Sequence, residues 1–267
     1  MELRHYYCPD PAEKPLDNLV EDGGFVGIFR RIAFVGDSLS SGEFEAVDSA
    51  GKRTYHDMFD YSWGQYICRA CGSFGYNFSR GGMTAKEYCE SFAEANGFWD
   101  EDKACQAYVI ALGVNDVINQ HQPIGSVDDI CREDYTQNAP TFTGYYARII
   151  QRYKKIQPHA RFFLVSMVHW HELGDRGADI LAHRDALNAL AEFFDHTYVL
   201  DLATYLPPYD KNFDRQYCLH GHMNPMGYIF TAKVIASYMD YIIRHNMPAF
   251  RQAAFIGTPM YDPALDV

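Results

Sequence analysis

The sequence predicts an α/β fold, in which a parallel sheet of about five strands lies between two layers of helices. Five short apolar runs have the length of buried strands, and they lie at 32–35, 74–78, 108–112, 162–168 and 198–202. Apolar stripes at helical spacing lie at 146–156, 187–194 and 229–242. Because strands alternate with helices, we expect parallel pairing, right-handed crossovers and a sheet that is covered on both faces. The predicted architecture is a three-layer α/β/α sandwich.

The length and composition favour one sizeable domain. The chain has 267 residues, of which 48% are hydrophobic, and it shows no internal repeat. We therefore expect a single domain over 1–267. Residues 1–30 are rich in Pro, Asp and Gly and are interpreted as an N-terminal arm. Residues 247–267 have no clear period, and we expect a tail that lies on the domain or on a neighbouring subunit. The sequence therefore leaves open whether the protein forms a homo-oligomer.

The charge and cysteine content narrow the choice of partners and compartment. The net charge is −12, from 35 acidic and 23 basic side chains, which argues against nucleic acid as a partner. No apolar run reaches about 18 residues, so we expect no membrane span. The seven cysteines are scattered and odd in number, and we interpret no secretory signal at the start. These features predict a cytoplasmic protein with free thiols.

Polar motifs follow several of the predicted strands directly. Gly36-Asp37-Ser38 follows the first apolar run, Gly113-Val114-Asn115-Asp116 follows the run at 108–112, and His169 and His171 follow the run at 162–168. In a parallel sheet the ligand site lies beyond the carboxyl ends of the strands, so these groups should meet at one edge. A serine there can act as a nucleophile if a base takes its proton. Alternatively, Asp37 and Ser38 only cap a helix or turn.

Four motifs in order resemble the blocks of the GDSL/SGNH hydrolase family. They span 36–228, most of the chain, and comprise Gly36-Asp37-Ser38-Leu39, the glycine Gly82 in SRGGMTA, Gly113-Val114-Asn115-Asp116, and His222-Met223-Asn224-Pro225-Met226-Gly227. The resemblance implies a flavodoxin-like SGNH hydrolase fold and a serine esterase that needs no cofactor. It also implies the roles: Ser38 as nucleophile, His222 as base, and the Ser38 amide, the Gly82 amide and the Asn115 side chain as oxyanion donors. The choice of Gly82 over Gly81 depends on the Met83-Thr84 that follows.

One position departs from the family pattern. The family usually has an aspartate three residues before the histidine, where this chain has Leu219. The nearest acidic residue upstream is Asp214, which is too distant in sequence to be placed. We therefore expect a Ser–His pair without a carboxylate, in which a backbone carbonyl near 217–220 orients the imidazole.

The segment His169-Trp170-His171 has two interpretations. Alternating histidines at a strand end can bind zinc, but no carboxylate or cysteine set completes this pair recognisably in the sequence. We therefore predict no metal, and we interpret His169, Trp170 and His171, together with Asp37, as candidate walls of the substrate pocket.

The function expected from these residues is hydrolysis of a carboxylic ester. A small-molecule substrate with a small acyl group, such as an O-acetylated carbohydrate, is the preferred choice. Two alternatives stay open: an acyltransferase that uses the same site with an alcohol in place of water, and a non-catalytic ligand-binding protein on a degenerate hydrolase scaffold.

Overall fold

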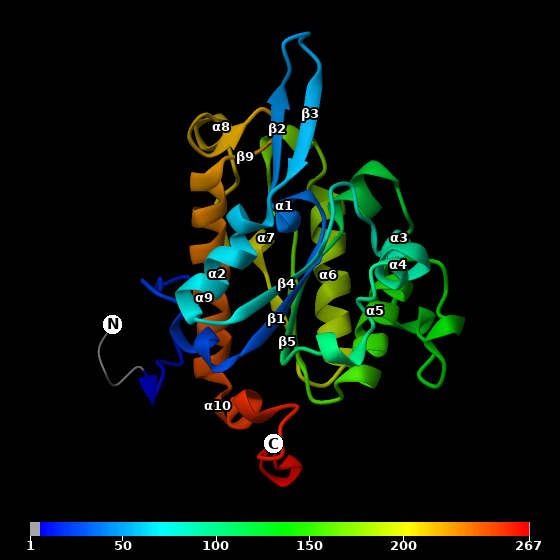
Figure 1. The fold of residues 1–267 in the computed structure, drawn as a ribbon, viewed down its shortest axis with the longest axis vertical. Helices are drawn as coiled ribbons and strands as arrows, with labels where there is room; N and C mark the ends of the chain where they lie inside the picture. The colour runs from blue at the N-terminus through cyan, green and yellow to red at the C-terminus, as the bar shows by residue number, and fades with distance from the viewer. Residues whose placement is uncertain (1–5, 267) are drawn as a thin grey trace.

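A five-stranded parallel sheet forms the centre of the molecule (Figure 1). The computed structural model describes residues 6–266. The strand order is β4-β1-β5-β6-β7, and all neighbours are parallel, as in the pairs Phe34↔Val109 and Val109↔Phe163. The strands are β1 (Arg31–Gly36), β4 (Phe74–Ser79), β5 (Ala107–Ala111), β6 (Arg161–Val165) and β7 (Thr197–Leu200). Each contains or overlaps one of the five predicted apolar runs, so the predicted sheet is confirmed.

Helices cover both faces of this sheet, which confirms the three layers. Side chains of a strand point alternately to its two faces, so Ile32 and Phe34 of β1 belong to one core, and Ala33 and Val35 belong to the other. The first core is closed by α2 (Trp63–Cys71) and α9 (Pro225–His245). The second is closed by α3 (Ala85–Glu87), α4 (Ala93–Ala95), α5 (Phe142–Ile156) and α6 (Gly177–Phe193). Within residues 6–266, no helix is both long enough and apolar enough to cross a membrane.

Two small antiparallel pairs and several short helices were not expected from the sequence. A hairpin of β2 (Glu43–Val47) and β3 (Arg53–Asp57) projects beyond the sheet, at the top of Figure 1. Its turn uses Gly51 at φ +79°, and Asp48 Oδ1 accepts from the amide of Lys52 at 2.9 Å. A second pair, β8 (Cys218–Leu219) and β9 (His222–Met223), lies near it. The short helices are α1 (Ser38–Ser41), α7 (Leu202–Tyr205), α8 (Lys211–Tyr217) and α10 (Met247–Phe250).

The described parts of the arm and the tail pack on the domain. Glu13 of the arm binds the buried Arg244 of α9 (Oε1–Nη2 2.7 Å), and the Arg244 side-chain hydrogen bond lowers the pKa of Glu13 to about 2. In the tail, Asp266 pairs with the buried Arg161 at the start of β6. The expected arm 1–30 and tail 247–267 thus make intramolecular ion pairs. Residues 1–5 and 267, which belong to these segments, lie outside the described part.

Candidate active site

A cavity of about 410 Å³ lies at the carboxyl edge of the sheet. Four residues singled out in the sequence line it, Ser38, Gly82, Asn115 and His222, although they are separated by up to 184 positions (222 − 38) in the chain. The volume lies in the range of small-molecule sites, about 300–1,000 Å³. The parallel sheet explains the convergence, because β1, β4 and β5 all end at this edge.

Ser38 begins the short helix α1 directly after β1. Asp37 caps this helix, and its Oδ1 accepts from the amide of Leu39 at 3.2 Å. The capping interpretation therefore describes Asp37, whereas Ser38 is half-buried and faces the cavity. The hydroxyls of the neighbouring Ser40 and Ser41 are buried, and Ser41 Oγ contacts Asp57. Burial raises the pKa of Asp37 to about 7, so its carboxyl is protonated in acid and titrates near neutral pH.

Asn115 and Gly82 both line the cavity, beyond the ends of β5 and β4. Asn115, in the turn Val114–Asn119, donates from Nδ2 to the carbonyl of Met83 at 3.2 Å and lies 3.4 Å from Asp37 Oδ2. Gly82 has φ +72°, a conformation that favours glycine. It lines the cavity, whereas a Cβ on Gly81 would lie 2.0 Å from Glu43 Oε2. The side-chain amide of Asn115 and the backbone at Gly82 can thus both present donors to one small region.

His222 lies between two carboxylates of the hairpin. Its Nε2 is 3.1 Å from Glu43 Oε1, and its Nδ1 is 3.4 Å from Glu45 Oε2. Among residues 6–266, no hydrogen bond joins His222 to Ser38, and such contacts are often long in enzymes without substrate. The expectation that no carboxylate lies within reach of this ring is wrong. The hairpin brings the two acids from a segment far away in the chain, whereas the family's aspartate lies three residues before the histidine.

The hairpin that carries these acids had a signal in the sequence, although its contact with His222 had none. Residues 43–47 and 53–57 flank the turn sequence DSAGK, and β-branched or aromatic side chains occur in both runs. In a strand, residues two apart face the same side, so Glu43 and Glu45 both face the histidine. Leu219, at the position where the family has an aspartate, is 49% exposed and pairs with His222 in the β8–β9 ladder.

The four residues predicted to form the pocket wall divide into two groups. Asp37 and Trp170 line the cavity. His169 and His171 do not, so their expected place in the wall is corrected. After β6 ends at Val165, the chain runs in a loop in which the backbone of His169 and His171 bonds with Tyr209, and His171 is exposed there.

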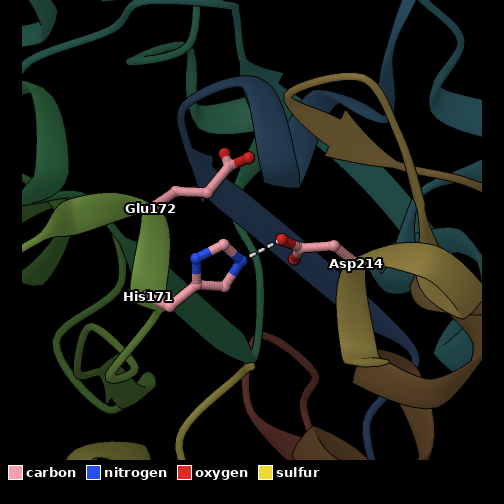
Figure 2. A group of neighbouring side chains, drawn as sticks. All are labelled: His171, Glu172 and Asp214. Carbon is pink, nitrogen blue, oxygen red and sulfur yellow. Dashed lines mark hydrogen bonds and ion pairs between the residues drawn. The ribbon is translucent and has the colours of Figure 1, made fainter. Parts of the chain in front are cut away.

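The ring of His171 instead contacts Asp214 of α8 (Figure 2). Asp214 also accepts from the indole Nε1 of Trp170 at 2.7 Å, so it fixes one wall of the cavity. Asp214 therefore contacts Trp170 and His171. The two acids that contact His222 are Glu43 and Glu45.

His171, Glu172 and Asp214 are the described residues whose donor atoms lie close enough together to hold a metal ion, within 4.8 Å of one another. No carboxylate set is recognisable beside the histidine pair in the sequence, but the fold brings Glu172 and Asp214 close to His171. Imidazole and carboxylate are suitable zinc ligands. However, both oxygens of Asp214 already accept hydrogen bonds, from Trp170 and His171, and these bonds account for the arrangement without an ion.

The inner part of the cavity is apolar. It extends toward the first core, between the sheet and α9, and its walls there include Trp63, Val165, Leu202, Met223 and Ile235. Such a lining binds hydrocarbon by burial, which is worth roughly 0.8 kcal/mol per CH₂. Ser38, Gly82 and Asn115 line the same cavity.

The sequence profile of the GDSL-like Lipase/Acylhydrolase family matches residues 34–229. This chain belongs to that family. The match includes Ser38, Gly82, Asn115 and His222, and it identifies the chain as a hydrolase of the esterase type. No curated protein matches the sequence.

Several solved structures share the fold. A protein from Lactobacillus plantarum superposes with a TM-score of 0.57 at 18% identity, covering 82% of this chain and 98% of the other. A carbohydrate esterase family 2 enzyme from Corynascus thermopiles (Myceliophthora fergusii) gives 0.54 at 16% identity, covering 86% and 69%. A family 3 carbohydrate esterase from Clostridium thermocellum gives 0.51 at 16%, covering 80% and 97%. At these identities the likeness establishes the fold alone.

Proposed function

We propose that this protein hydrolyses carboxylic esters through an acyl-enzyme on Ser38. The observation that carries the proposal is the convergence of Ser38, Gly82, Asn115 and His222 on one cavity. Ser38 Oγ attacks the ester carbonyl while His222 Nε2 takes the hydroxyl proton, and the carbonyl becomes a tetrahedral oxyanion. His222 returns the proton to the leaving alcohol. Water then attacks the acyl-enzyme by the same route and releases the acid.

The oxyanion is stabilised by three neutral donors. These are the backbone amides of Ser38 and Gly82 and the side-chain amide of Asn115. Donors that are already aimed at the oxygen cost no reorganisation during the reaction, and one of them is typically worth about 10²–10³ in rate.

We propose a small-molecule ester as substrate, with O-acetylated carbohydrate as the first class to test. The fold shared with two carbohydrate esterases supports a sugar as the alcohol part. Trp170, fixed by Asp214, offers an aromatic face on which a sugar ring can stack. The apolar inner wall supports binding of an acyl group through hydrocarbon contacts, including groups longer than acetyl.

The test combines covalent labelling with a substrate panel. A fluorophosphonate probe should label the native protein at Ser38, and p-nitrophenyl esters and acetylated sugars should be hydrolysed. Ser38→Ala should lose both, with turnover falling by about 10⁶. Ser40→Ala, a buried neighbour, is the matched control and should still be labelled. An unlabelled native protein that binds acetylated sugars without hydrolysing them would contradict the proposal and favour a binding protein.

A further inference from the structure

We propose that Glu45, supplied by the β2–β3 hairpin, is the carboxylate that orients His222 in place of the missing aspartate. In this role Glu45 is a positioning residue, because it contacts the base and not the substrate. The inference rests on the proposed function for its catalytic consequence, although the orientation of the ring can be measured without activity.

The Glu45 carboxylate is held by three contacts. Its side chain is 2% exposed. Oε2 accepts from the Gly221 amide at 3.0 Å and lies 3.4 Å from His222 Nδ1. Oε1 pairs with Arg53 Nη1 at 2.7 Å. A carboxylate fixed in this way, with an oxygen facing Nδ1, favours the tautomer that carries its proton on Nδ1 and leaves Nε2 free to accept.

The same contacts keep Glu45 ionised. Burial by itself favours the neutral acid, but the hydrogen bonds from Gly221 and His222, together with the charge of Arg53, outweigh burial and hold the pKa of Glu45 below its ordinary value. Glu45 is therefore a carboxylate at neutral pH. A charged acceptor at Nδ1 also stabilises the imidazolium that forms while Ser38 is attacking.

Glu43 contacts the other nitrogen and has a different role. Burial raises the pKa of Glu43, and the nearby Asp57 and Glu45 add to this, although His222 opposes it. With Nδ1 protonated toward Glu45, the contact of 3.1 Å between Nε2 and Glu43 holds one shared proton. For Nε2 to accept the Ser38 proton, Glu43 has to leave this contact. Only Glu45 can remain in place during the reaction.

The hairpin explains why Leu219 is tolerated. In this chain, β2 contacts both β8 and β9, and the rings of Tyr55 and His222 pack in a T-shaped arrangement with centroids 5.9 Å apart. The hairpin thus occupies the side of the ring that needs an acceptor. Position 219 needs no hydrogen-bond acceptor, because Glu45 of the hairpin supplies one to His222, and it is occupied by the exposed Leu219.

The kinetic test compares Glu45→Gln with Arg53→Gln. Gln keeps the shape of Glu45 but removes its charge, and we expect kcat to fall by about 10²–10⁴ with little change in KM, as when a triad carboxylate is made neutral. The acid limb of the kcat/KM profile should also move to lower pH. Glu45→Asp should recover part of the activity. Arg53→Gln removes one of the three contacts that hold Glu45 but leaves the Glu45 carboxylate facing His222, so its loss of kcat should be smaller than that of Glu45→Gln.

A second measurement reads the ring directly. Histidine ¹⁵N–¹H spectra, with His222 assigned by comparison with His222→Gln, should show a hydrogen-bonded proton on Nδ1 in native protein and in Ser38→Ala. This signal should be lost or displaced in Glu45→Gln. If the native ring carries its proton on Nε2 and the spectrum is the same in Glu45→Gln, the inference is wrong, whether or not the protein is an esterase.

The two proposals fail in distinguishable ways. A native protein that is neither labelled at Ser38 nor active on esters would contradict the proposed function, and the spectra would still decide the role of Glu45. A native protein that is active and labelled, with a folded Glu45→Gln variant at native kcat, would contradict the role of Glu45 alone. Thermal unfolding of each variant checks the fold.

Discussion

The buried His183 of α6 donates from Nε2 to the carbonyl oxygen of Leu112 at 2.9 Å, while its Nδ1 accepts from the amide of Met167 at 3.4 Å. The tautomer follows from these partners, because a carbonyl can only accept and an amide can only donate. His183 therefore joins the loops after β5 and β6. A Cβ at Gly113 would lie 2.3 Å from its Nε2, which explains the glycine in this motif.

This arrangement predicts a loss of stability in acid. Burial lowers the pKa of His183 to about 4, whereas it is about 6.5 in an unfolded chain. The unfolded state therefore binds more protons between these values. The contribution of neutral His183 to the free energy of unfolding is fully present above pH 6.5 and is lost as the pH falls toward 4. From pH 7.5 to 5.0 we expect a loss of about 2 kcal/mol in the free energy of unfolding from this group.

Urea unfolding of native protein and His183→Gln at both pH values checks this prediction. The variant should be less stable at pH 7.5 but lose less between pH 7.5 and 5.0. The buried Asp37 and Asp116 titrate with the opposite sign, since burial raises the pKa of each to about 7. They are present in both proteins and cancel in the difference. An equal pH dependence in the two proteins would show that His183 is not held neutral.

Asn115→Ala should lower kcat by about 10²–10³, because the donor is needed mainly once the oxygen is negative. KM should change little, and loss of the contact with Met83 should cost about 1 kcal/mol of stability. Steady-state kinetics on a p-nitrophenyl ester measure both constants. Asn119→Ala is the comparison variant: Asn119 also lines the cavity, but its Nδ2 donates to Asn115 Oδ1 at 2.9 Å and is not one of the proposed oxyanion donors, so its effect on kcat should be much smaller. A rise in KM alone for Asn115→Ala would indicate ground-state binding.

Asp214→Ala should raise KM and leave kcat nearly unchanged. Asp214 fixes Trp170, and loss of that bond should cost about 1 kcal/mol of substrate binding, or roughly fivefold in KM. In a Trp170→Phe background, which lacks the indole donor, the same substitution should add little. A fall in kcat of about 10⁴ would instead give Asp214 the role of a triad acid.

Ile235→Phe should shift the enzyme toward shorter acyl groups. Ile235 is buried on α9 and lines the inner cavity, so a larger ring fills space that an acyl chain would use. We expect the ratio of kcat/KM for p-nitrophenyl butyrate over acetate to fall. Val234→Ile, the adjacent buried position outside the cavity wall, should leave this ratio unchanged. Both changes can cost about 1–3 kcal/mol of stability through overpacking, so thermal unfolding accompanies the assay.

The sheet could be predicted because its signal is local. Buried parallel strands are short and almost wholly apolar, and each of the five runs formed a strand at or near the predicted bounds. The rule that ligands bind beyond the carboxyl ends of such strands then predicted that Ser38 and Asn115 lie near one another. Both line the cavity. For Ser38 and Asn115, the chain order and the strand direction were sufficient to predict that both lie at the same edge of the sheet.

The environment of His222 was decided by the tertiary structure. The sequence shows that Leu219 cannot accept a hydrogen bond, but it does not show which distant residue can. The packing of the hairpin against β9 places Glu43 and Glu45 on the ring, across 177 positions of chain between Glu45 and His222. In the same way, α8 brings Asp214 to Trp170 and His171. The local sequence therefore determined the strands and the motif residues that end them. Which acid contacts which ring depends on long-range packing, which leaves no periodic pattern in the sequence.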